Sequence, residues 1–570
     1  MRRSLVAAVL TLVTLVTLAS PGFAQAPVPK VTISGLFDQI TSMGRNTYDG
    51  NLTRNSDSEW YGRTRFRPDF EFSVGRVRAV LGLEIDLAYG QMGPNDGGFP
   101  GNTSGAAGGV AATAGSPVPG CKVNTNGCLD VNTDVGGMIE IKWIYTEFPL
   151  TGKDSLLPFI PVETMARAGG QPFDTLAQYK LAQFANGDFA GVSAITTFTP
   201  NIKTNLAYVI IEDQLAGANR GNPSLKTGRG EDYSIIFSPE FTPTKGLDIK
   251  PLFDWIHADG QTSGTVRRNL VNFGTVGGTL NGTAARGGPL TPAAAGDPTY
   301  HENRYTIGVD ARWRVGGFGL DPTLYYQWGT VDSQAFITSP GATGSKKTSA
   351  DMTAFLLDVI ASYQLGPLLL EARGSYSTGN KARDNLATKI RYFQPLDTDG
   401  NYFAGGWTQF WASGVDYFNQ GWATTGNYIG YDRYGRGSIA FRATYNITPA
   451  LSLYGVVHTF LTAQAVDTDT GSQLAATGGA GTPARITISP KSWASGDSNY
   501  VGTEGNLGMT WRFSANTAFD LVGAYLFAGD ALDASECPGQ ATGTTCSASA
   551  ARKKSAQDAY SLAARIRLAF

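Results

Sequence analysis

The stretch that decides the fold is residues 60–90, WYGRTRFRPDFEFSVGRVRAVLGLEIDLAYG. Apolar and polar side chains alternate on both sides of the dipeptide Gly75-Arg76. Because successive side chains of a β-strand point to opposite faces, one face of each half is almost wholly apolar and the other carries every charge. Glycine between the halves favours a tight turn. The stretch therefore predicts a β-hairpin with an apolar face and a charged face.

The charged face of this hairpin supplies most of the candidate functional residues: Arg63, Arg65, Arg67, Asp69, Glu71, Glu84 and Asp86. With a two-residue turn at Gly75-Arg76, Arg67 faces Glu84. Arg65 likewise faces Asp86, whereas Arg63 faces an alanine. Opposite charges across a ladder stabilise it by about 0.2–1 kcal/mol. Two interpretations stay open: the pairs only neutralise one another and stiffen the sheet, or the three arginines create a field that orients solutes and sets ion preference.

The same alternation recurs along the chain, from residues 30–41 to residues 558–570. It predicts about 18 antiparallel strands, with about 16 as the alternative count. Short turns such as Leu365-Gly366-Pro367 join the strands at one end. The connections at the other end are long: 90–136, 260–302, 380–434, 464–498 and 530–557. Short turns at one rim and long loops at the other are expected of a transmembrane antiparallel β-barrel, with the turns periplasmic and the loops extracellular.

The composition of the 570 residues agrees with an all-β barrel and excludes other classes. Charged residues make up only 16% of the chain, whereas soluble chains have about 25%. Glycine accounts for 71 of the 570 residues, about 12%, whereas soluble chains have about 7%. The net charge of −2 lacks the basic footprint of a nucleic-acid binder, so no nucleic-acid partner is expected. No run beyond the first residues resembles a transmembrane helix. Only a closed barrel could then span a membrane, because unpaired backbone groups cannot face lipid.

Residues 1–24 have the pattern of a secretory signal peptide. Two arginines open it, residues 5–18 are apolar, and Gly22-Phe23-Ala24 places small residues at the positions that the peptidase inspects. The apolar stretch is short for a membrane anchor, which needs about 20 residues. We therefore expect cleavage after Ala24 and a single barrel domain at residues 25–570.

The two ends of the mature chain carry a family resemblance. Residues 559–570, AYSLAARIRLAF, alternate in character and finish on the terminal Phe570. Together with the signal peptide and the opening strand 31–37, VTISGLF, they make the chain resemble a Gram-negative outer-membrane porin of the trimeric, general-diffusion type. The resemblance covers the whole mature chain, but it is one of architecture and of the two ends.

The resemblance implies a location and a function. It implies export through the periplasm to the outer membrane, contact with lipid and lipopolysaccharide, and recognition of Phe570 by the machinery that inserts barrels. It also implies a homotrimer with water-filled channels for passive diffusion of small hydrophilic solutes and ions, without enzyme activity, cofactor or metal. Three alternatives stay open: a channel selective for sugars or aromatic solutes, a barrel sheath for an electron-transfer protein, and a lipase with His257 or His458 as its base.

Porins of this kind often fold the third outward loop into the lumen as a constriction. In this chain that loop is Gly170–Gly187, with Asp174 and Lys180 within it and Asp188 beside it. The loop departs from the acidic composition typical of general porins. Ion preference therefore does not carry over from the resemblance.

The predicted strand 137–148 supplies two more candidate lining residues. Glu140 and Lys142 are expected to point inward. The reason is that the alternate positions take the apolar face: Ile139, Ile141, Trp143 and Tyr145.

The four cysteines form two close pairs in predicted outer loops, Cys121 with Cys128 and Cys537 with Cys546. In an exported chain disulfides persist, so each pair is expected to close a small loop. A metal site built from all four thiolates is the competing interpretation. The spacing within each pair is wider than the usual zinc pattern, which disfavours it.

Residues 392–434 are crowded with aromatic side chains. Three interpretations stay open. The rings pack the loop on itself or on neighbouring loops, they form a stacking surface for sugars or aromatic solutes, or they contact a neighbouring subunit.

Overall fold

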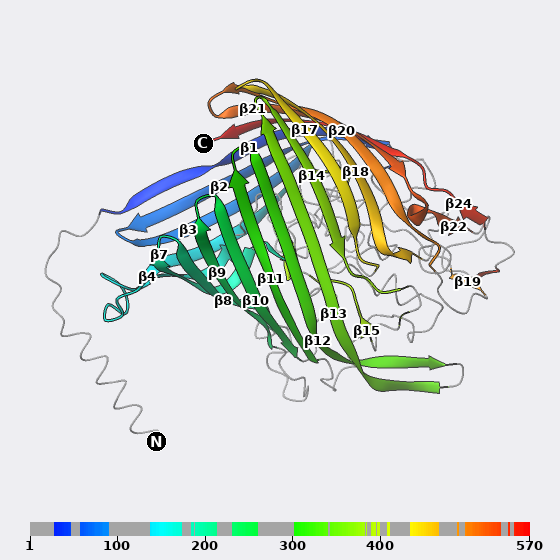
Figure 1. Cartoon of the computed structure of the whole chain (residues 1–570), viewed down its shortest axis with the longest axis horizontal. Helices are drawn as coiled ribbons and strands as arrows, with labels where there is room; N and C mark the ends of the chain where they lie inside the picture. The colour runs from blue at the N-terminus through cyan, green and yellow to red at the C-terminus, as the bar shows by residue number, and fades with distance from the viewer. Residues whose placement is uncertain are drawn as a thin grey trace, which may run out of the picture.

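The computed structural model of the chain is a closed β-barrel (Figure 1). The structure describes residues 28–46, 58–89, 137–173, 184–186, 188–213, 231–259, 301–339, 342–381, 384, 389–394, 396–398, 407–410, 434–466, 487–489, 496–536, 545–547 and 552–570. The predicted signal peptide lies outside these residues. Among them, no helix is long and apolar enough to cross a membrane.

The main sheet has 19 strands, of which β15 (Lys389–Ile390) joins only through a short parallel pairing to β13. The other strands form the barrel wall: β1 (Lys30–Arg45), β2 (Ser58–Val74), β3 (Val77–Tyr89), β4 (Gly137–Thr151), β5 (Glu163–Pro172), β7 (Asp188–Thr199), β8 (Ile202–Asp213), β9 (Glu231–Thr244), β10 (Leu247–Asp259), β11 (His301–Val315), β12 (Phe318–Ser339), β13 (Ala342–Leu365), β14 (Leu368–Ser377), β17 (Gly437–Thr448), β18 (Leu451–Val466), β20 (Ser498–Ser514), β21 (Thr517–Ala528) and β25 (Ala559–Ala569). Each wall strand is antiparallel to both neighbours. The predicted all-β barrel of 18 strands is confirmed.

The barrel closes where the two ends of the chain meet. β1 pairs with β25 from Leu36↔Ala569 to Arg45↔Tyr560. The backbone N–H of Gly35 donates to the carbonyl of Phe570 at 2.9 Å, and the N–H of Phe570 donates back at 3.0 Å. An even number of strands places both ends at the short-turn rim.

Tight turns form the short-turn rim because the sequence provides glycine where the backbone must adopt the left-handed conformation, with positive φ. Gly75 between β2 and β3 has a φ of 60°, and Gly366 between β13 and β14 has a φ of 55°. Other residues rarely adopt this conformation, whereas glycine enters it without a steric penalty. These turns fix the register of their hairpins.

The hairpin of β12 and β13 is longer than the sequence predicts. The expected strands, 319–330 and 351–365, stop near the rim, yet the two strands pair as far as Ser339↔Ala342. β11 ends its pairing with β12 at His301↔Asp332. Beyond that point β12 and β13 pair only with each other, and the ribbon projects from the barrel (Figure 1).

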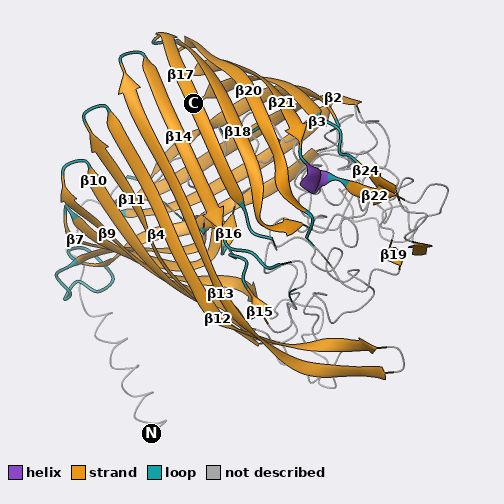
Figure 2. Cartoon of the chain, turned by 45° about the vertical axis from the view of Figure 1, so that its right-hand side comes forward, coloured by secondary structure: helices purple, strands orange, loops and turns teal. Residues whose placement is uncertain are grey.

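Several short elements lie on the long-loop side. They are β6 (Ala185–Asn186), β16 (Asp397–Thr398), β19 (Thr487–Ser489), the 3-10 turn η4 (Asp530–Leu532), β22 (Ala534–Glu536), β23 (Thr545–Ser547) and β24 (Arg552–Lys554). β6 pairs in parallel with β16, which is labelled in Figure 2. This pairing brings together two connections that are far apart in the sequence.

Candidate functional site

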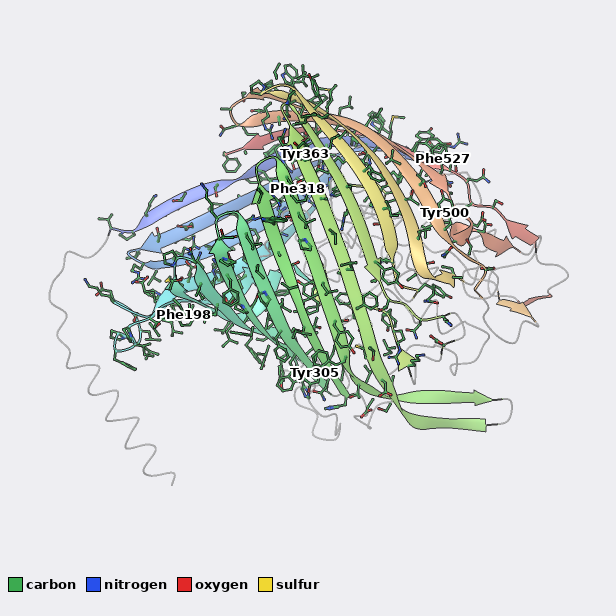
Figure 3. The ribbon with its side chains drawn as sticks, in the orientation of Figure 1. Phe198, Tyr305, Phe318, Tyr363, Tyr500 and Phe527 are labelled. Atoms are coloured by element: carbon green, nitrogen blue, oxygen red, sulfur yellow. The ribbon has the colours of Figure 1, made fainter. Side chains whose placement is uncertain are left out.

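The wall has an apolar outer face, and its inner face carries the charged side chains together with a cluster of buried apolar side chains that includes Ile236, Leu252 and Leu356. Large apolar side chains such as Phe198, Tyr363 and Phe527 are more than half exposed on the outside (Figure 3). Their neighbours in sequence point inward, because side chains alternate along a strand. On β13, for example, Leu357 is exposed, whereas the adjacent Asp358 is fully buried. In a soluble protein, by contrast, charged side chains lie on the outer surface and are rarely buried.

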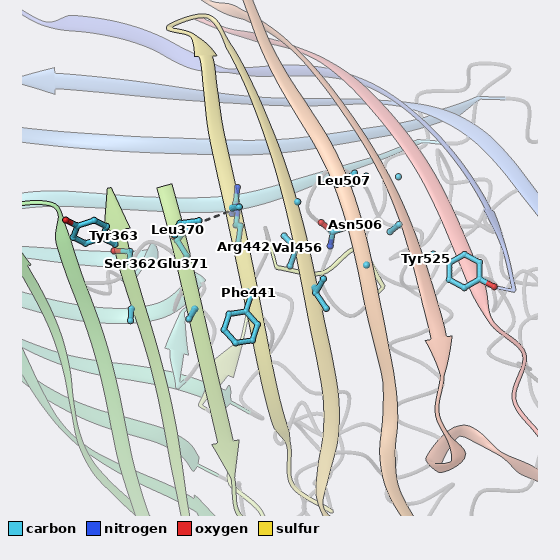
Figure 4. Close-up of a pocket in the computed structure, with 18 of the residues that line it drawn as sticks. Ser362, Tyr363, Leu370, Glu371, Phe441, Arg442, Val456, Asn506, Leu507 and Tyr525 are labelled. Carbon is cyan, nitrogen blue, oxygen red and sulfur yellow. Dashed lines mark ion pairs between the residues drawn. The ribbon is translucent and has the colours of Figure 1, made fainter. Parts of the chain in front are cut away.

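The outer face also carries a shallow groove of about 1080 Å³ across β13, β14, β17, β18, β20 and β21 (Figure 4). Aromatic and aliphatic side chains such as Phe441 and Leu507 rim it. On the opposite side of the same wall Arg442 and Glu371 form an ion pair at 3.7 Å. A single layer of strands thus carries apolar side chains on its outer surface and an ion pair on its inner side here.

The predicted register of the first hairpin is confirmed. Arg65 pairs with Asp86, and Arg63 pairs with Ala88. The ion pair expected between Arg67 and Glu84 is present, with Nε and Oε2 3.2 Å apart.

Glu84 is the centre of a charged cluster on the inner wall. Its carboxylate also binds Arg65 at 2.7 Å and lies 3.8 Å from the ammonium of Lys142 on β4. Lys142 therefore points inward, as predicted. Three cations share this carboxylate, so the cluster is more than a set of one-to-one pairs. Arg63 lies on β2 with Arg65 and Arg67. Arg63 is buried, whereas 28% of the Arg67 side chain is exposed to solvent.

The predicted acidic residues of β2, Asp69 and Glu71, also contact side chains of neighbouring strands. Asp69 accepts a hydrogen bond from Nε1 of Trp143 at 2.9 Å. Glu71 lies 3.2 Å from Arg78, which also binds Glu147 at 2.7 Å. These side chains link β2, β3 and β4 across the inner wall.

The prediction that Trp143 and Tyr145 face outward is wrong. The register between β3 and β4 shifts between Gly82 and Leu83, so Lys142 is an extra residue in β4. One extra residue sends every later side chain to the opposite face. Ile144 is therefore exposed and Tyr145 is buried, and Trp143 crosses Gly82 to reach Asp69.

Some predicted site residues have no described side chain. Asp86 and Glu140 lie in β3 and β4, where Glu140 pairs with Glu84 in the ladder. Asp188 lies at the start of β7, and Cys546 lies in β23. The remaining members of the predicted constriction and disulfides lie outside the described residues: Asp174, Lys180, Cys121, Cys128 and Cys537.

A belt of ion pairs near the short-turn rim was not predicted. Its N–O distances range from 2.5 to 3.7 Å, and its members are Asp38–Arg567, Glu71–Arg78, Glu147–Arg167, Asp248–Arg312, Asp321–Arg314, Glu371–Arg442 and Asp520–Arg565. The pairs contain as many carboxylates as arginines. Near the short-turn rim this favours the interpretation that the opposite charges only neutralise one another and stiffen the sheet. A signal was available for several members, because Glu371, Asp520 and Arg565 stand a few residues from a short turn or the chain end.

The aromatic segment 392–434 was predicted as an outer loop, and part of it lies inside the barrel. Tyr392, Phe393, Trp407 and Phe410 are buried. Phe393 packs against Phe184 at a centroid distance of 6.2 Å, which supports packing on a neighbouring connection. Buried rings leave no face for stacking a solute, so these described rings do not support the stacking surface.

The three histidines are accounted for by local contacts. Nδ1 of His257 lies 3.1 Å from Oδ1 of Asn303, which also contacts His301. His458 points inward and its Nδ1 lies 3.0 Å from the carbonyl oxygen of Trp407. Among the residues with described side chains, no group of three or more His, Cys, Asp or Glu residues could hold a metal ion.

Comparisons with known proteins find likeness only in solved structures. No protein-family model and no curated protein matches the chain. Pseudomonas aeruginosa OccK8 (OprE) is 10% identical, with 95% of this chain and 98% of that chain covered and a TM-score of 0.44. The outer membrane protein OprD of the same organism is 9% identical over 96% and 95%, with a TM-score of 0.43. Acinetobacter baumannii OccAB4 is 9% identical over 94% and 98%, with a TM-score of 0.43. The likeness is too distant to argue function, which has to rest on the geometry of the barrel.

Proposed function

We propose that this chain is an outer-membrane porin whose barrel encloses a water-filled channel for passive diffusion of small hydrophilic solutes and ions. The observation that carries the proposal is the inverted wall, with exposed apolar side chains outside and ionised side chains inside. Soluble monomers rarely expose apolar patches above a few hundred Å². An apolar band around a closed barrel is stable when lipid surrounds it, and barrels of 16–18 strands leave an aqueous lumen.

The charged cluster around Glu84 supports a role in ion preference. Passive flux needs lumen polarity and an electric field, and no catalytic group. Among the described side chains, Arg65, Arg67 and Lys142 share the carboxylate of Glu84, and we expect this excess of cations to add positive potential to the lumen. The balanced belt near the short turns adds little net potential. We propose that the arginines of β2 bias the channel toward anions.

The remaining parts of the proposal concern processing and assembly. The signal peptide at residues 1–24 is removed, Phe570 is read by the insertion machinery, the cysteine pairs form disulfides, and the barrel assembles as a homotrimer in contact with lipid and lipopolysaccharide. Support comes from the sequence at the two ends and from the pairing of Phe570 with Gly35, which makes the terminal residue part of the closed wall.

Solute entry into liposomes tests the function. Purified protein in vesicles should let small sugars and amino acids enter, and the swelling rate should fall as the solute grows. Folded protein that admits no solute would refute the channel. Ester hydrolysis or co-purified haem in the same preparation would favour the lipase or the electron-transfer sheath instead.

A further inference from the structure

Residues 407–410 lie against the inner wall of the barrel. All four side chains are buried. Their contacts are with His458 on β18 and Glu504 on β20, which are fully buried. Both wall residues point inward, because the adjacent Val457 is 55% exposed on the outside and His458 pairs directly with Glu504. The segment therefore occupies part of the lumen.

Glu504 holds the segment through charge-assisted hydrogen bonds. Oγ1 of Thr408 donates to Oε2 of Glu504 at 2.5 Å, and the backbone N–H of Gln409 donates to Oε1 at 2.6 Å. Asn506 on the same strand supplies another donor at 3.0 Å. Hydrogen bonds to an ionised acceptor are about twice as strong as neutral ones. A buried carboxylate is costly without donors, and the segment supplies two of the three described here.

We call the contacts of residues 407–410 with Glu504 and His458 the dock. Trp407 adds an apolar contact to it. Its side chain packs with Ile360 of β13, Ala440 of β17 and Val456 of β18. Its carbonyl oxygen accepts from Nδ1 of His458 at 3.0 Å. The segment thus bridges the inner faces of four strands.

A second anchor holds residues 389–394 and 396–398. The backbone N–H of Gln394 donates to Oε1 of Gln327 at 2.9 Å, and Nε2 of Gln327 donates to the carbonyl of Gln394 at 2.6 Å. Arg304 on β11 donates to the side-chain oxygen of Gln394 at 2.7 Å. The N–H of Leu396 donates to the carbonyl of Phe184 at 2.8 Å, so this stretch also meets the end of the predicted constriction loop.

We propose that Glu504 and His458 are positioning residues that dock residues 407–410 on the wall and thereby set the calibre of the pore. The proposal rests on the channel function above and adds a specific determinant of its size. Residues 407–410 of the connection between β14 and β17 then narrow the lumen, in addition to the third loop, to which the sequence alone assigned the constriction. Loss of the dock frees the segment and widens the passage or makes it fluctuate.

Two substitutions weaken the dock with little change of shape. Glu504→Gln removes the charge, and Thr408→Val removes the donor hydroxyl. Each should raise the fraction of undocked segment about tenfold or more, since loss of a charge-assisted hydrogen bond reaches that factor. Ser193→Ala is the matched control, because it removes a buried hydrogen bond between β7 and β5 that does not touch the segment. Unchanged heat-modifiable mobility in gels verifies that each variant folds.

Single-channel recording and cysteine labelling together decide the proposal. Both dock variants should show larger or more frequently fluctuating conductance, with Ser193→Ala like the parent. In a Gln409→Cys background, a water-soluble maleimide should label residue 409 about tenfold faster when Glu504→Gln is added. Conductance and labelling unchanged in both dock variants would overturn the dock while leaving the channel in place. A folded parent that never conducts would instead refute the proposed function, and the labelling result would still report on the dock.

Discussion

Substitution of Gly82 by alanine tests the corrected register between β3 and β4. A Cβ atom at Gly82 would lie 1.8 Å from Nε1 and 2.2 Å from Cδ1 of Trp143. The indole must therefore move, and its 2.9 Å hydrogen bond to Asp69 is lost or distorted. Overpacking costs about 1–3 kcal/mol, and a lost hydrogen bond to a charged group about 1.5–3 kcal/mol. We expect Gly82→Ala to lower the free energy of unfolding by about 2.5–6 kcal/mol.

Urea unfolding of the refolded barrel in lipid vesicles, followed by tryptophan fluorescence, measures the cost. A lower midpoint with an unchanged slope reports a pure loss of stability. Gly374→Ala is the control, because a Cβ there meets nothing within 4 Å on the outer face. It should change stability by less than about 0.5 kcal/mol or increase it.

A double-mutant cycle isolates the contact. In a Trp143→Ala background the added methyl of Gly82→Ala has room, so its cost should shrink by about 1 kcal/mol or more. Equal costs in both backgrounds, or equal effects of Gly82→Ala and Gly374→Ala, would show that Trp143 does not cross Gly82. The prediction from the sequence, in which Trp143 faces outward, would then be correct.

The remaining predictions concern ion preference and assembly. Replacing Arg63, Arg65 and Arg67 together by alanine should move the reversal potential in a KCl gradient toward cation preference, and an unchanged potential would refute the field. Glu84→Gln should move it the opposite way, because three cations lose their shared carboxylate; a shift toward cations would contradict this charge balance. Deleting Phe570 should lower the yield of folded barrel in the outer membrane, measured by heat-modifiable mobility, because the residue pairs with the first strand; full yield would show that the terminal residue is dispensable.

The barrel wall was predictable because its determinants are local. Period-two alternation gives the strands, and a glycine turn such as Gly75 fixes the register of a hairpin. That Arg65 lies opposite Asp86 in the ladder follows from these two facts alone. Closure follows from the need to pair every backbone group in lipid.

The bulge at Lys142 was missed because the sequence around it alternates without a visible break. Ile139, Ile141, Trp143 and Tyr145 read as one continuous apolar face. The available signal lay on the partner strand, where Gly82 leaves space for a large ring. A missing side chain opposite an aromatic residue indicates a close approach, which the alternation pattern does not encode.

The inward positions of residues 389–394 and 407–410 could not be derived from the sequence. Their contacts join residues far apart in the chain, such as Gln394 with Gln327 and Thr408 with Glu504. A long polar connection with many aromatic rings is compatible with several positions. Only the wall, with a buried carboxylate facing the lumen, determines which one it takes.

The claim on which everything depends is that water and ions pass through the middle of this barrel. Current across a planar lipid bilayer after addition of purified, folded protein measures this directly. The account predicts stepwise, reproducible increases in conductance that scale with salt concentration. A folded protein that inserts into the bilayer and leaves the current at the baseline would contradict it.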